Sequence, residues 1–188
     1  NLMRLWKTRH KRTLLNHSKY LTVEEHTVEL PDGQTIADWP WIITPDFVNV
    51  LAVTALGEFL LFRQTKYGID GLTLAPVGGY IEPGEDPLAA AQRELMEETG
   101  FQAKEWVSLG DFIGCPNRGF ARGYLYLALD ARQVASPSAD DLEEQEVLLL
   151  SRDQVEEALF AGEIKAMMWA ANVALALQYL DHRAGTPA

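Results

Sequence analysis

Apolar residues near the start of the chain alternate with polar ones at the two-residue period of a β-strand. Leu and Val residues between positions 21 and 30 stand among Thr, Glu and His, which predicts a strand there. Pro31-Asp32-Gly33 follows as a turn signal, and residues 34–43 are predicted to return as a second strand. A hairpin this small cannot hold a core alone, so it must pack on the rest of the chain or on a second copy of it.

The middle of the chain predicts three apolar strands followed by a helix. The strands are expected over residues 47–54, 58–65 and 72–77. Asp86 is a favourable N-cap and Pro87 suits the first helical position, so a helix is predicted to begin at Pro87. Gly100 is typical of the residue that follows a last helical turn, which ends this helix near Thr99.

The last third of the chain mixes strands and helices without a regular alternation of the two. Strands are predicted over residues 106–112, 120–129 and 146–150, a loop over 134–141, and helices from Ser151 to about Gly162 and over 166–181. This order predicts an α+β fold with a mixed sheet. Pro45-Asp46 marks a boundary, so residues 1–45 are expected to form an N-terminal β hairpin region and residues 46–188 the main domain.

Charge is distributed unevenly along the 188 residues, which carry a net charge of −11. Residues 1–20 hold only basic charged residues, whereas acids outnumber bases in the remainder. The acidic body argues against nucleic-acid binding. The basic start could contact an anion, but a solvated and partly frayed terminus is the preferred interpretation. The single Cys115 fits a reducing cytoplasm, and no stretch is apolar enough to predict a membrane span.

The helix predicted after Asp86 carries a concentration of acids. Glu94, Glu97 and Glu98 share one face at helical spacing, and Arg93 can pair with Glu97 but cannot neutralise all three. A solvated charged face is the ordinary explanation of such a pattern. The alternative is a site for Mg²⁺, which takes oxygen ligands and would allow an anionic phosphate to approach. Gly78-Gly79 would let the backbone come close to such a site and offer a carbonyl ligand.

The segment Gly79–Phe101 resembles the Nudix box at every fixed position of that motif. The matching residues are Gly79, Glu85, Arg93, Glu94, Leu95, Glu97, Glu98, Gly100 and Phe101. Agreement at this many fixed positions is a specific signal, and it outweighs the interpretation as a solvated face. The box covers a short part of the chain, but the strands before it and the helices after it also suit the Nudix family.

The Nudix resemblance implies hydrolysis of a nucleoside diphosphate linked to another group, on an α/β/α sandwich around a mixed sheet. It implies that Glu94 and Glu98 bind Mg²⁺, with Mn²⁺ as a substitute, and that Glu97 adds a ligand or an ordered water. The carbonyl of Gly78 would complete the cluster, and Arg93 would orient it through a salt bridge to Glu85. Glu97, Glu98 and Arg93 are thus candidate catalytic residues for a metal-assisted attack of water, without a covalent intermediate.

Features outside the box are similar to the ADP-ribose pyrophosphatase branch of this family. That branch has an N-terminal hairpin that is exchanged between the subunits of a homodimer and supplies aromatic residues that stack on the base. Tyr20 and Trp39 are the candidates for this role, with Trp41 in reserve. Arg63 and Lys66 end a predicted strand where the branch binds phosphate; at Lys66 a lysine replaces the usual arginine, which keeps the charge and loses its bidentate geometry.

Residues 141–146 resemble the acidic catalytic loop of the same branch, and Pro116 stands where the branch carries its characteristic proline. Glu143 or Glu144, with Asp141 behind them, would act as the general base on the attacking water. Acids that the branch often carries before the box and after Gly119 are missing, which leaves the sugar side of the substrate open. Arg118 and Arg122 could bind phosphate or sugar hydroxyls, or could be exposed.

The favoured function is Mg²⁺-dependent hydrolysis of the pyrophosphate bond of ADP-ribose or a related nucleoside diphosphate sugar, a small-molecule substrate. One alternative keeps the chemistry on another substrate, such as GDP-mannose or a dinucleotide. The other is a Nudix-fold sensing module without turnover, which is ranked lower because the box is complete. His10, His17, His26 and His182 show no metal-ligand spacing and are expected at the surface.

Overall fold

The computed structural model describes residues 3–138 and 144–185 and divides the chain into two compact units. Unit 1 comprises Asn1–Asp46 and Ile113–Arg122, and unit 2 comprises Phe47–Phe112 and Gly123–Ala188. Glu143 and Asp141, two of the candidates for the general base, lie outside the described residues. In the described part of the chain, no helix is long and apolar enough to cross a membrane.

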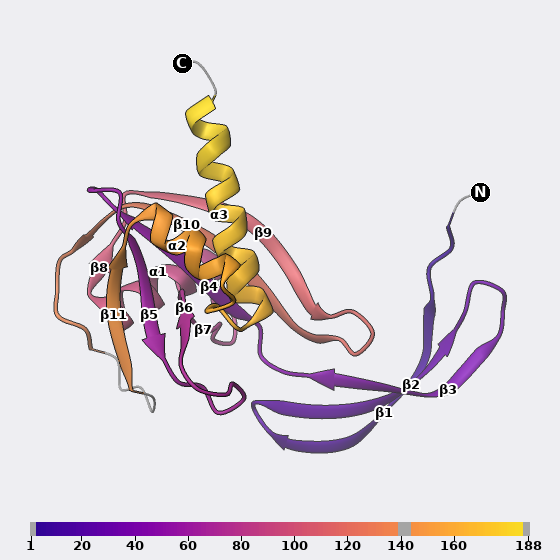
Figure 1. Cartoon of the computed structure of the whole chain (residues 1–188). Coiled ribbons are helices and arrows are strands. Elements are labelled where there is room, and N and C mark those ends of the chain that lie inside the picture. Colours follow the sequence, from indigo (N-terminus) through magenta and orange to yellow (C-terminus); the bar gives the residue numbers. More distant parts are fainter. Residues whose placement is uncertain (1–2, 139–143, 186–188) are drawn as a thin grey trace. The chain divides into compact units, whose positions relative to one another are not determined.

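Unit 1 is built on a three-stranded antiparallel sheet, one strand more than the predicted hairpin (Figure 1). Its strands β1 (Lys7–Ser18), β2 (Leu21–Glu29) and β3 (Thr35–Ile43) follow one another in the order β1-β2-β3. The turn between β2 and β3 lies where Pro31-Asp32-Gly33 predicts it, and Gly33 has a φ of 92°, which favours glycine.

Strand β1 corrects the expectation that residues 1–20 form a frayed terminus, although its side chains are exposed as expected. Two of its arginines form salt bridges with acids of β2, Arg9 with Glu29 and Arg12 with Glu25. Cross-strand pairs of opposite charge stabilise a sheet modestly, and the backbone ladder from Lys7 to Ser18 adds to this. All the side chains of β1 are exposed in the single chain, so pairing with β2 and not burial holds this strand.

Unit 2 contains a mixed sheet. Its central path runs β11-β5-β4-β10-β8, while β6 pairs with β5, β7 with β4, and β9 with β10. The pair β4–β10 is parallel and the other pairs in the sheet whose direction is assigned are antiparallel. The strands are β4 (Phe47–Thr54), β5 (Phe59–Gln64), β6 (Thr73–Ala75), β7 (Val77–Tyr80), β8 (Phe101–Gln102), β9 (Glu105–Cys115), β10 (Phe120–Gln133) and β11 (Gln145–Leu150).

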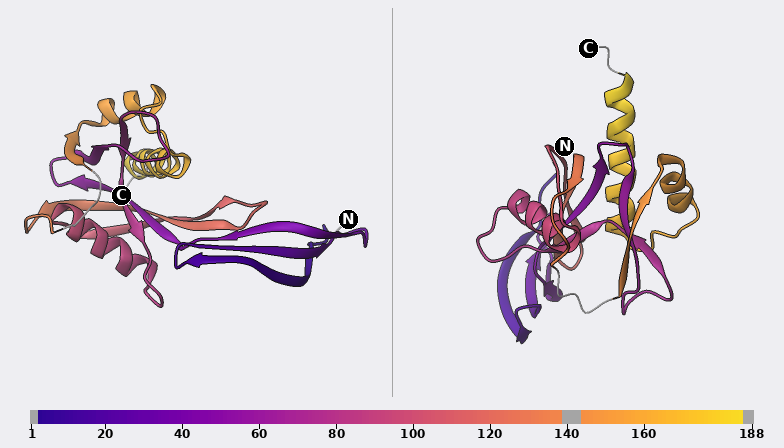
Figure 2. Two further views of the ribbon diagram at one scale, coloured as in Figure 1. Left: turned by 90° about the horizontal axis from the view of Figure 1, so that it is seen from below. Right: turned by 90° about the vertical axis from the view of Figure 1, so that its left-hand side faces the viewer.

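Helices cover both faces of this sheet, as Figure 2 shows in its left view. Helix α1 (Pro87–Thr99) packs through Ala90, Ala91 and Leu95 on one face of β4 and β5, and helices α2 (Arg152–Phe160) and α3 (Met167–Gly185) pack on the other. Alternate residues of β4 serve the two faces, because successive side chains of a strand point to opposite sides. The α/β/α sandwich and the mixed sheet are therefore confirmed.

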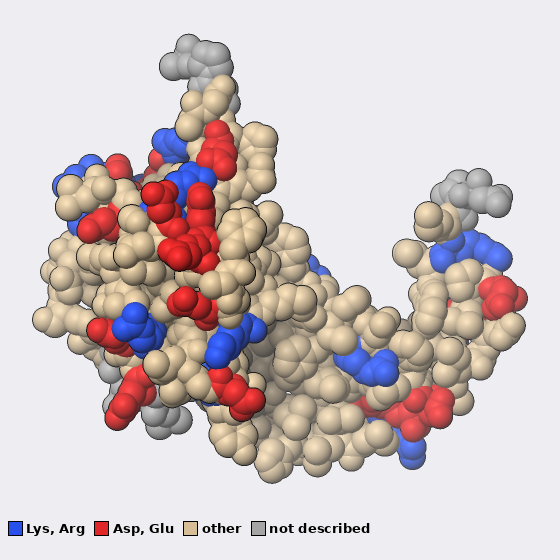
Figure 3. Space-filling view, in the orientation of Figure 1, with Lys and Arg blue, Asp and Glu red and all other residues tan. Residues whose placement is uncertain are grey.

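Several element bounds differ from those that the sequence predicts. Strand β9 continues beyond the predicted 106–112 into the hairpin tip that belongs to unit 1, β10 continues beyond the predicted 120–129 to Gln133 within unit 2, and the short β8 is not predicted. Acidic residues outnumber basic ones in the chain. On the face of unit 2 that Figure 3 shows, acidic side chains gather around α2. The part of the fold that positions the acids of the Nudix-like motif is α1 together with the strand β7.

Candidate active site

Helix α1 begins and ends where its local sequence signals predict. The carboxylate of Asp86 accepts hydrogen bonds from the backbone N–H groups of Leu88 and Ala89 at 3.0 and 3.2 Å. At the other end Gly100 has a φ of 73°, and its N–H donates to the carbonyl of Met96 at 2.8 Å. These caps fix the start of the helix, and with it the direction in which its acidic side chains project.

Arg93 lies at the centre of a network that joins α1 to the strand and the loop before it. Its Nε and Nη2 each donate to one carboxylate oxygen of Glu85 at 2.9 Å, a bidentate arrangement. Nη1 donates to Glu94 at 2.7 Å and to Glu97 at 3.2 Å. Nη2 also donates to the carbonyl of Tyr80 at 3.1 Å. One guanidinium therefore holds three of the four acids of the motif together.

The same contacts shift the pKa values of both partners of the central pair. Hydrogen bonding to Arg93, followed by the backbone hydrogen bond within the Glu82–Glu85 turn, lowers the pKa of Glu85 from its ordinary 4.5. The pKa of Arg93 is raised, chiefly by the hydrogen bond to Glu85. Glu85 is therefore ionised at neutral pH, and its charge is committed to orienting Arg93.

The carboxylate of Glu94 lies directly against the backbone of β7. A Cβ atom at Gly79 would overlap the Cδ and both oxygens of Glu94, so a larger residue there would displace this carboxylate. Gly78 is restricted in the same way by the amide of Asn49 on β4. Glu94 is consequently sheltered, with 13% of its side chain exposed, whereas 48% of the Glu97 side chain is exposed.

Glu94 and Glu98 stand one helical turn apart and offer a pair of oxygen donors. Oε2 of Glu98 is buried. No three Asp, Glu, His or Cys side chains converge at metal-ligand spacing anywhere in residues 3–138 and 144–185. A pair of carboxylates nevertheless suits Mg²⁺, because this ion usually keeps several waters and binds through one or two carboxylates. The donor set therefore fits a hard divalent cation.

The end of β5 brings a second group of predicted residues close to the acidic loop. Arg63 lies opposite Glu146 in the β5–β11 register and forms an exposed salt bridge with it at 3.1 Å. Lys66 is partly buried in the turn that follows β5, and its carbonyl accepts from Ile69 at 2.9 Å. Glu144 is exposed immediately before β11. The sheet thus places Arg63 beside residues 144–146, the part of the acidic segment 141–146 that the structure describes.

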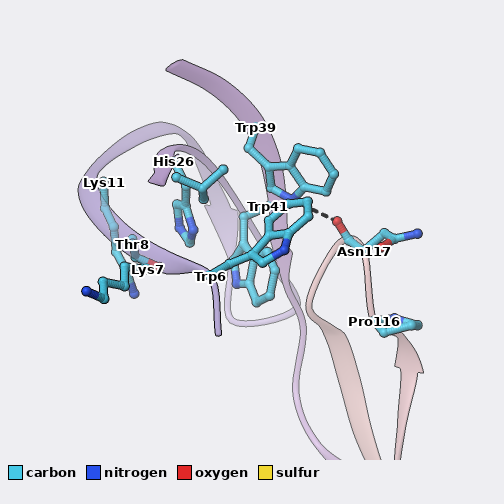
Figure 4. Close-up of a pocket in the computed structure, with 10 residues that line it drawn as sticks. Trp6, Lys7, Thr8, Lys11, His26, Trp39, Trp41, Pro116 and Asn117 are labelled. Atoms are coloured by element: carbon cyan, nitrogen blue, oxygen red, sulfur yellow. Dashed lines mark hydrogen bonds between the residues drawn. The ribbon is translucent and has the colours of Figure 1, made fainter. Parts of the chain in front are cut away.

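Unit 1 contains a pocket of about 370 Å³ that includes Trp39 (Figure 4). The indole N–H of Trp39 donates to the carbonyl of Asn117 at 3.0 Å, and the guanidinium of Arg118 lies 5.3 Å from the centre of its ring. Trp41, the reserve candidate, lines the same pocket. The structure therefore brings together Trp39 and Arg118, two residues that the sequence proposes separately as substrate contacts.

His26 corrects the expectation that all four histidines lie at the surface. It is 3% exposed, its ring stacks on Trp41 with 5.2 Å between centres, and its Nε2 lies 2.7 Å from the carboxylate of Glu24. Trp6 also lines the pocket. The sequence offers no periodic signal for either residue, because both positions depend on how β1, β2 and β3 pair.

Tyr20 and Arg122 do not line this pocket. Tyr20 is exposed in the turn between β1 and β2, with the Lys19 ammonium 4.9 Å from its ring centre. The register of β2 with β3 places Trp39 opposite His26, further along the sheet. Arg122 is exposed, and its backbone N–H donates to Asp46 at 2.9 Å.

Two protein families match the chain, and together they cover most of it. The NUDIX domain family matches residues 44–170, and the nucleoside diphosphate sugar hydrolase N-terminal domain matches residues 6–42. The chain is 30% identical over 163 residues to the ADP-ribose pyrophosphatase of Bacillus subtilis, covering 87% of this chain and 86% of that protein. It is 31% identical over 154 residues to the methanol dehydrogenase activator of Bacillus methanolicus, covering 82% and 81%.

A solved structure gives the same result for the fold. The crystal structure of an ADP compounds hydrolase aligns with 99% of this chain and 100% of its own at a TM-score of 0.83, with 20% identity. The family match over most of the chain and the identity to the Bacillus subtilis protein together show that the chain belongs to the Nudix hydrolase family.

The Glu85–Arg93 pair should make stability depend on pH. Because the folded pKa of Glu85 is lowered, its contribution to the free energy of unfolding is present above its ordinary pKa of 4.5 and is lost as the pH falls through the lowered value. Glu85→Gln should cost about 1 kcal/mol near neutral pH and progressively less in acid. Urea unfolding of both proteins across this pH range measures the difference.

Glu82→Gln is the matched control, since Glu82 is an exposed acid of the same loop and forms no ion pair within the described residues. It should leave the free energy of unfolding almost unchanged at both ends of the range. A constant deficit for Glu85→Gln from neutral to acid pH would contradict the assignment of this pair as the origin of the pH dependence.

Proposed function

We propose that this Nudix protein hydrolyses the pyrophosphate bond of ADP-ribose, or of a related nucleoside diphosphate sugar, with Mg²⁺ as the cofactor. The products would be a nucleoside monophosphate and a sugar phosphate. The observation that carries the proposal is the arrangement of the α1 acids, two of which Arg93 binds, with the Glu94 carboxylate against the backbone of Gly79. The similarity to an ADP-ribose pyrophosphatase over most of both chains supports the choice of substrate.

In this proposal Glu94 and Glu98 hold the divalent ion, and the family generally uses such ions. Glu97 adds a ligand or fixes an ordered water, and the carbonyl of Gly78 completes the donor set. When bound, Mg²⁺ supplies a Lewis acid that makes bound water a better nucleophile and stabilises charge on the bridging oxygen. Arg93 acts as a positioning residue, because its hydrogen bonds fix the carboxylates of Glu94 and Glu97.

Glu143 or Glu144 is proposed to accept the proton of the attacking water. Glu144 has a carboxylate that is exposed and therefore accessible to substrate, and it directly precedes β11. Arg63, on the neighbouring strand, and Lys66 are proposed to bind the phosphates, whose negative charge they would balance. The general base in residues 143–144 needs to lie within hydrogen-bond distance of the attacking water only in the complex with substrate and metal.

Tyr20, Trp39, Arg118 and Arg122 are proposed to bind the nucleoside and sugar parts of the substrate. The stacking of Arg118 on Trp39 supports this role for the pair, because it presents a cation beside an aromatic surface. The proposal assigns residues 1–45 to an N-terminal exchange region and 46–188 to the catalytic domain. A cytoplasmic location stays a prediction from the single cysteine.

Glu98→Gln should lower kcat for ADP-ribose by about 10²–10³-fold, because it removes a charged metal ligand whose effect is worth several kcal/mol. The assay follows AMP and ribose 5-phosphate release with Mg²⁺ present and with EDTA, and runs GDP-mannose and a dinucleoside polyphosphate alongside. Glu157→Gln, an exposed acid on α2, is the matched control and should keep wild-type activity. Mg²⁺-independent turnover, or none on any of these substrates, would overturn the proposal.

Glu143→Gln and Glu144→Gln separate the two candidates for the general base. Loss of a general base costs about 10²–10⁴-fold in rate, so one variant should lose kcat with little change in KM, while the other stays near wild type. The rate of the defective variant should also lose its acidic pH limb, which a purely structural defect would not remove. Wild-type pH profiles for both variants would exclude a base at these two positions.

The N-terminal sheet is proposed to join two copies of the chain into a homodimer. The exposed side chains along all of β1 support this, since a three-stranded sheet needs a packed hydrophobic face to be stable alone. Sedimentation equilibrium should give twice the mass of the 21.0 kDa chain, and deletion of residues 1–18 should give a monomer if it remains folded. A full-length protein that sediments as a monomer at micromolar concentration would contradict the homodimer.

A further inference from the structure

The connection between α2 and α3, residues 161–166, is bound to the start of β6 by hydrogen bonds. The carbonyl of Glu163 accepts from the backbone N–H of Leu74 at 2.9 Å and from the hydroxyl of Thr73 at 2.9 Å. The Thr73 hydroxyl in turn accepts from the backbone N–H of Lys165 at 3.1 Å. Thr73 is only 2% exposed, so these bonds are shielded from water and fix the backbone at Lys165.

The side chain of Lys165 adds a longer-range contact to this backbone attachment. Lys165 is exposed, and its ammonium donates to the main-chain carbonyl of Asp70 at 2.7 Å. An exposed ammonium is strongly hydrated and its stem is flexible, whereas a charged donor makes a stronger hydrogen bond than a neutral one. Lys165 therefore ties the α2–α3 connection to the loop between β5 and β6, residues 65–72.

This loop is the one that carries Lys66. Gln64 of β5 pairs with Thr73 of β6, which closes the loop at its base, and the N–H of Ile69 donates to the carbonyl of Lys66 at 2.9 Å. Most residues of the loop are exposed, so burial contributes little to its conformation. The bond from Lys165 reaches Asp70 directly after the Lys66–Ile69 turn, and it therefore restrains the position of that turn.

We propose that Lys165 is a positioning residue, which holds Asp70 and thereby keeps the turn at Lys66 where the Lys66 ammonium can bind the diphosphate of the substrate. The role of Lys66 rests on the proposed function, while the restraint rests on the geometry of unit 2. Lys165 itself does not touch the substrate. A loop that is ordered before binding costs the substrate less conformational entropy, which lowers KM. Lys165 belongs to neither α1 nor the loop before it, so kcat should not depend on it.

Lys165→Met removes the donor and keeps an apolar side chain. It should raise KM for ADP-ribose by about fivefold to tenfold, the effect of losing one hydrogen bond of this kind, and leave kcat within about twofold of the wild type. Lys165→Arg retains a charged donor and should restore KM to within about twofold. The matched control, Lys104→Met, changes another exposed lysine of unit 2 and should leave KM unchanged.

A double-mutant cycle with Lys66→Met tests whether Lys165 acts through Lys66. Residues that serve one interaction have non-additive effects, whereas independent residues have additive ones. Lys66→Met should raise KM at least as much as Lys165→Met does, and adding Lys165→Met to it should raise KM no further. A purely structural role would instead lower the midpoint of urea unfolding and leave KM unchanged. An unchanged KM in Lys165→Met, or additive effects of the two substitutions, would overturn the proposal.

Isothermal titration calorimetry with ADP in EDTA separates this outcome from that of the hydrolysis assay, because binding requires no turnover. Lys165→Met and Lys66→Met should each weaken ADP and leave adenosine, which lacks the diphosphate, unchanged. ADP binding that depends on both lysines, in a protein that hydrolyses none of the tested substrates, would retain the inference and reject the proposed function. Mg²⁺-dependent hydrolysis with a KM that Lys165→Met does not change would do the reverse.

Discussion

The interaction on which the candidate active site depends is the set of hydrogen bonds made by Arg93. Glu85, Glu94 and Glu97 come from a loop and from two positions on α1, and the carbonyl of Tyr80 ends β7. Without a cation among them these acids would repel one another, and the helix would gain more by turning them to solvent. A planar guanidinium with donors at fixed angles can satisfy several carboxylates at once, which an ammonium could not do with the same geometry. Arg93 therefore sets both the position and the direction of the acidic side chains.

The network also accounts for the glycine at position 79. Once Arg93 draws the Glu94 carboxylate toward β7, that carboxylate occupies the space in which a side chain at Gly79 would begin. A side chain at Gly79 would displace this carboxylate from its place against β7. Burial of Ala90, Ala91 and Leu95 holds the same face of α1 against the sheet. The apolar packing and the polar contacts of Glu94 therefore act together to fix the helix on β7.

Sequence reasoning succeeded where the determining signals are local. The bounds of α1 depend on Asp86, Pro87 and Gly100, which act within a turn of their own positions, and all three are confirmed. It failed for β1, because strand formation there depends on acids of β2 that lie far along the chain, and a run of exposed basic residues resembles a solvated terminus. The burial of His26 was missed for the same reason, since it depends on the pairing of β2 with β3. The fold class was predictable because it depends on the order of the elements, whereas the pocket in unit 1 depends on register.

Charge is separated along the sequence in a way that suits two ligands of opposite sign. Coordination of a divalent cation requires an excess of carboxylates, which α1 and the preceding loop provide, whereas capture of a phosphate requires uncompensated cations. Placing both sets in one segment would let them neutralise each other, as Arg9 and Arg12 are neutralised by the acids of β2. The charged residues among the first twenty are all lysine or arginine, and two of these arginines stabilise the three-stranded sheet by pairing with acids of β2.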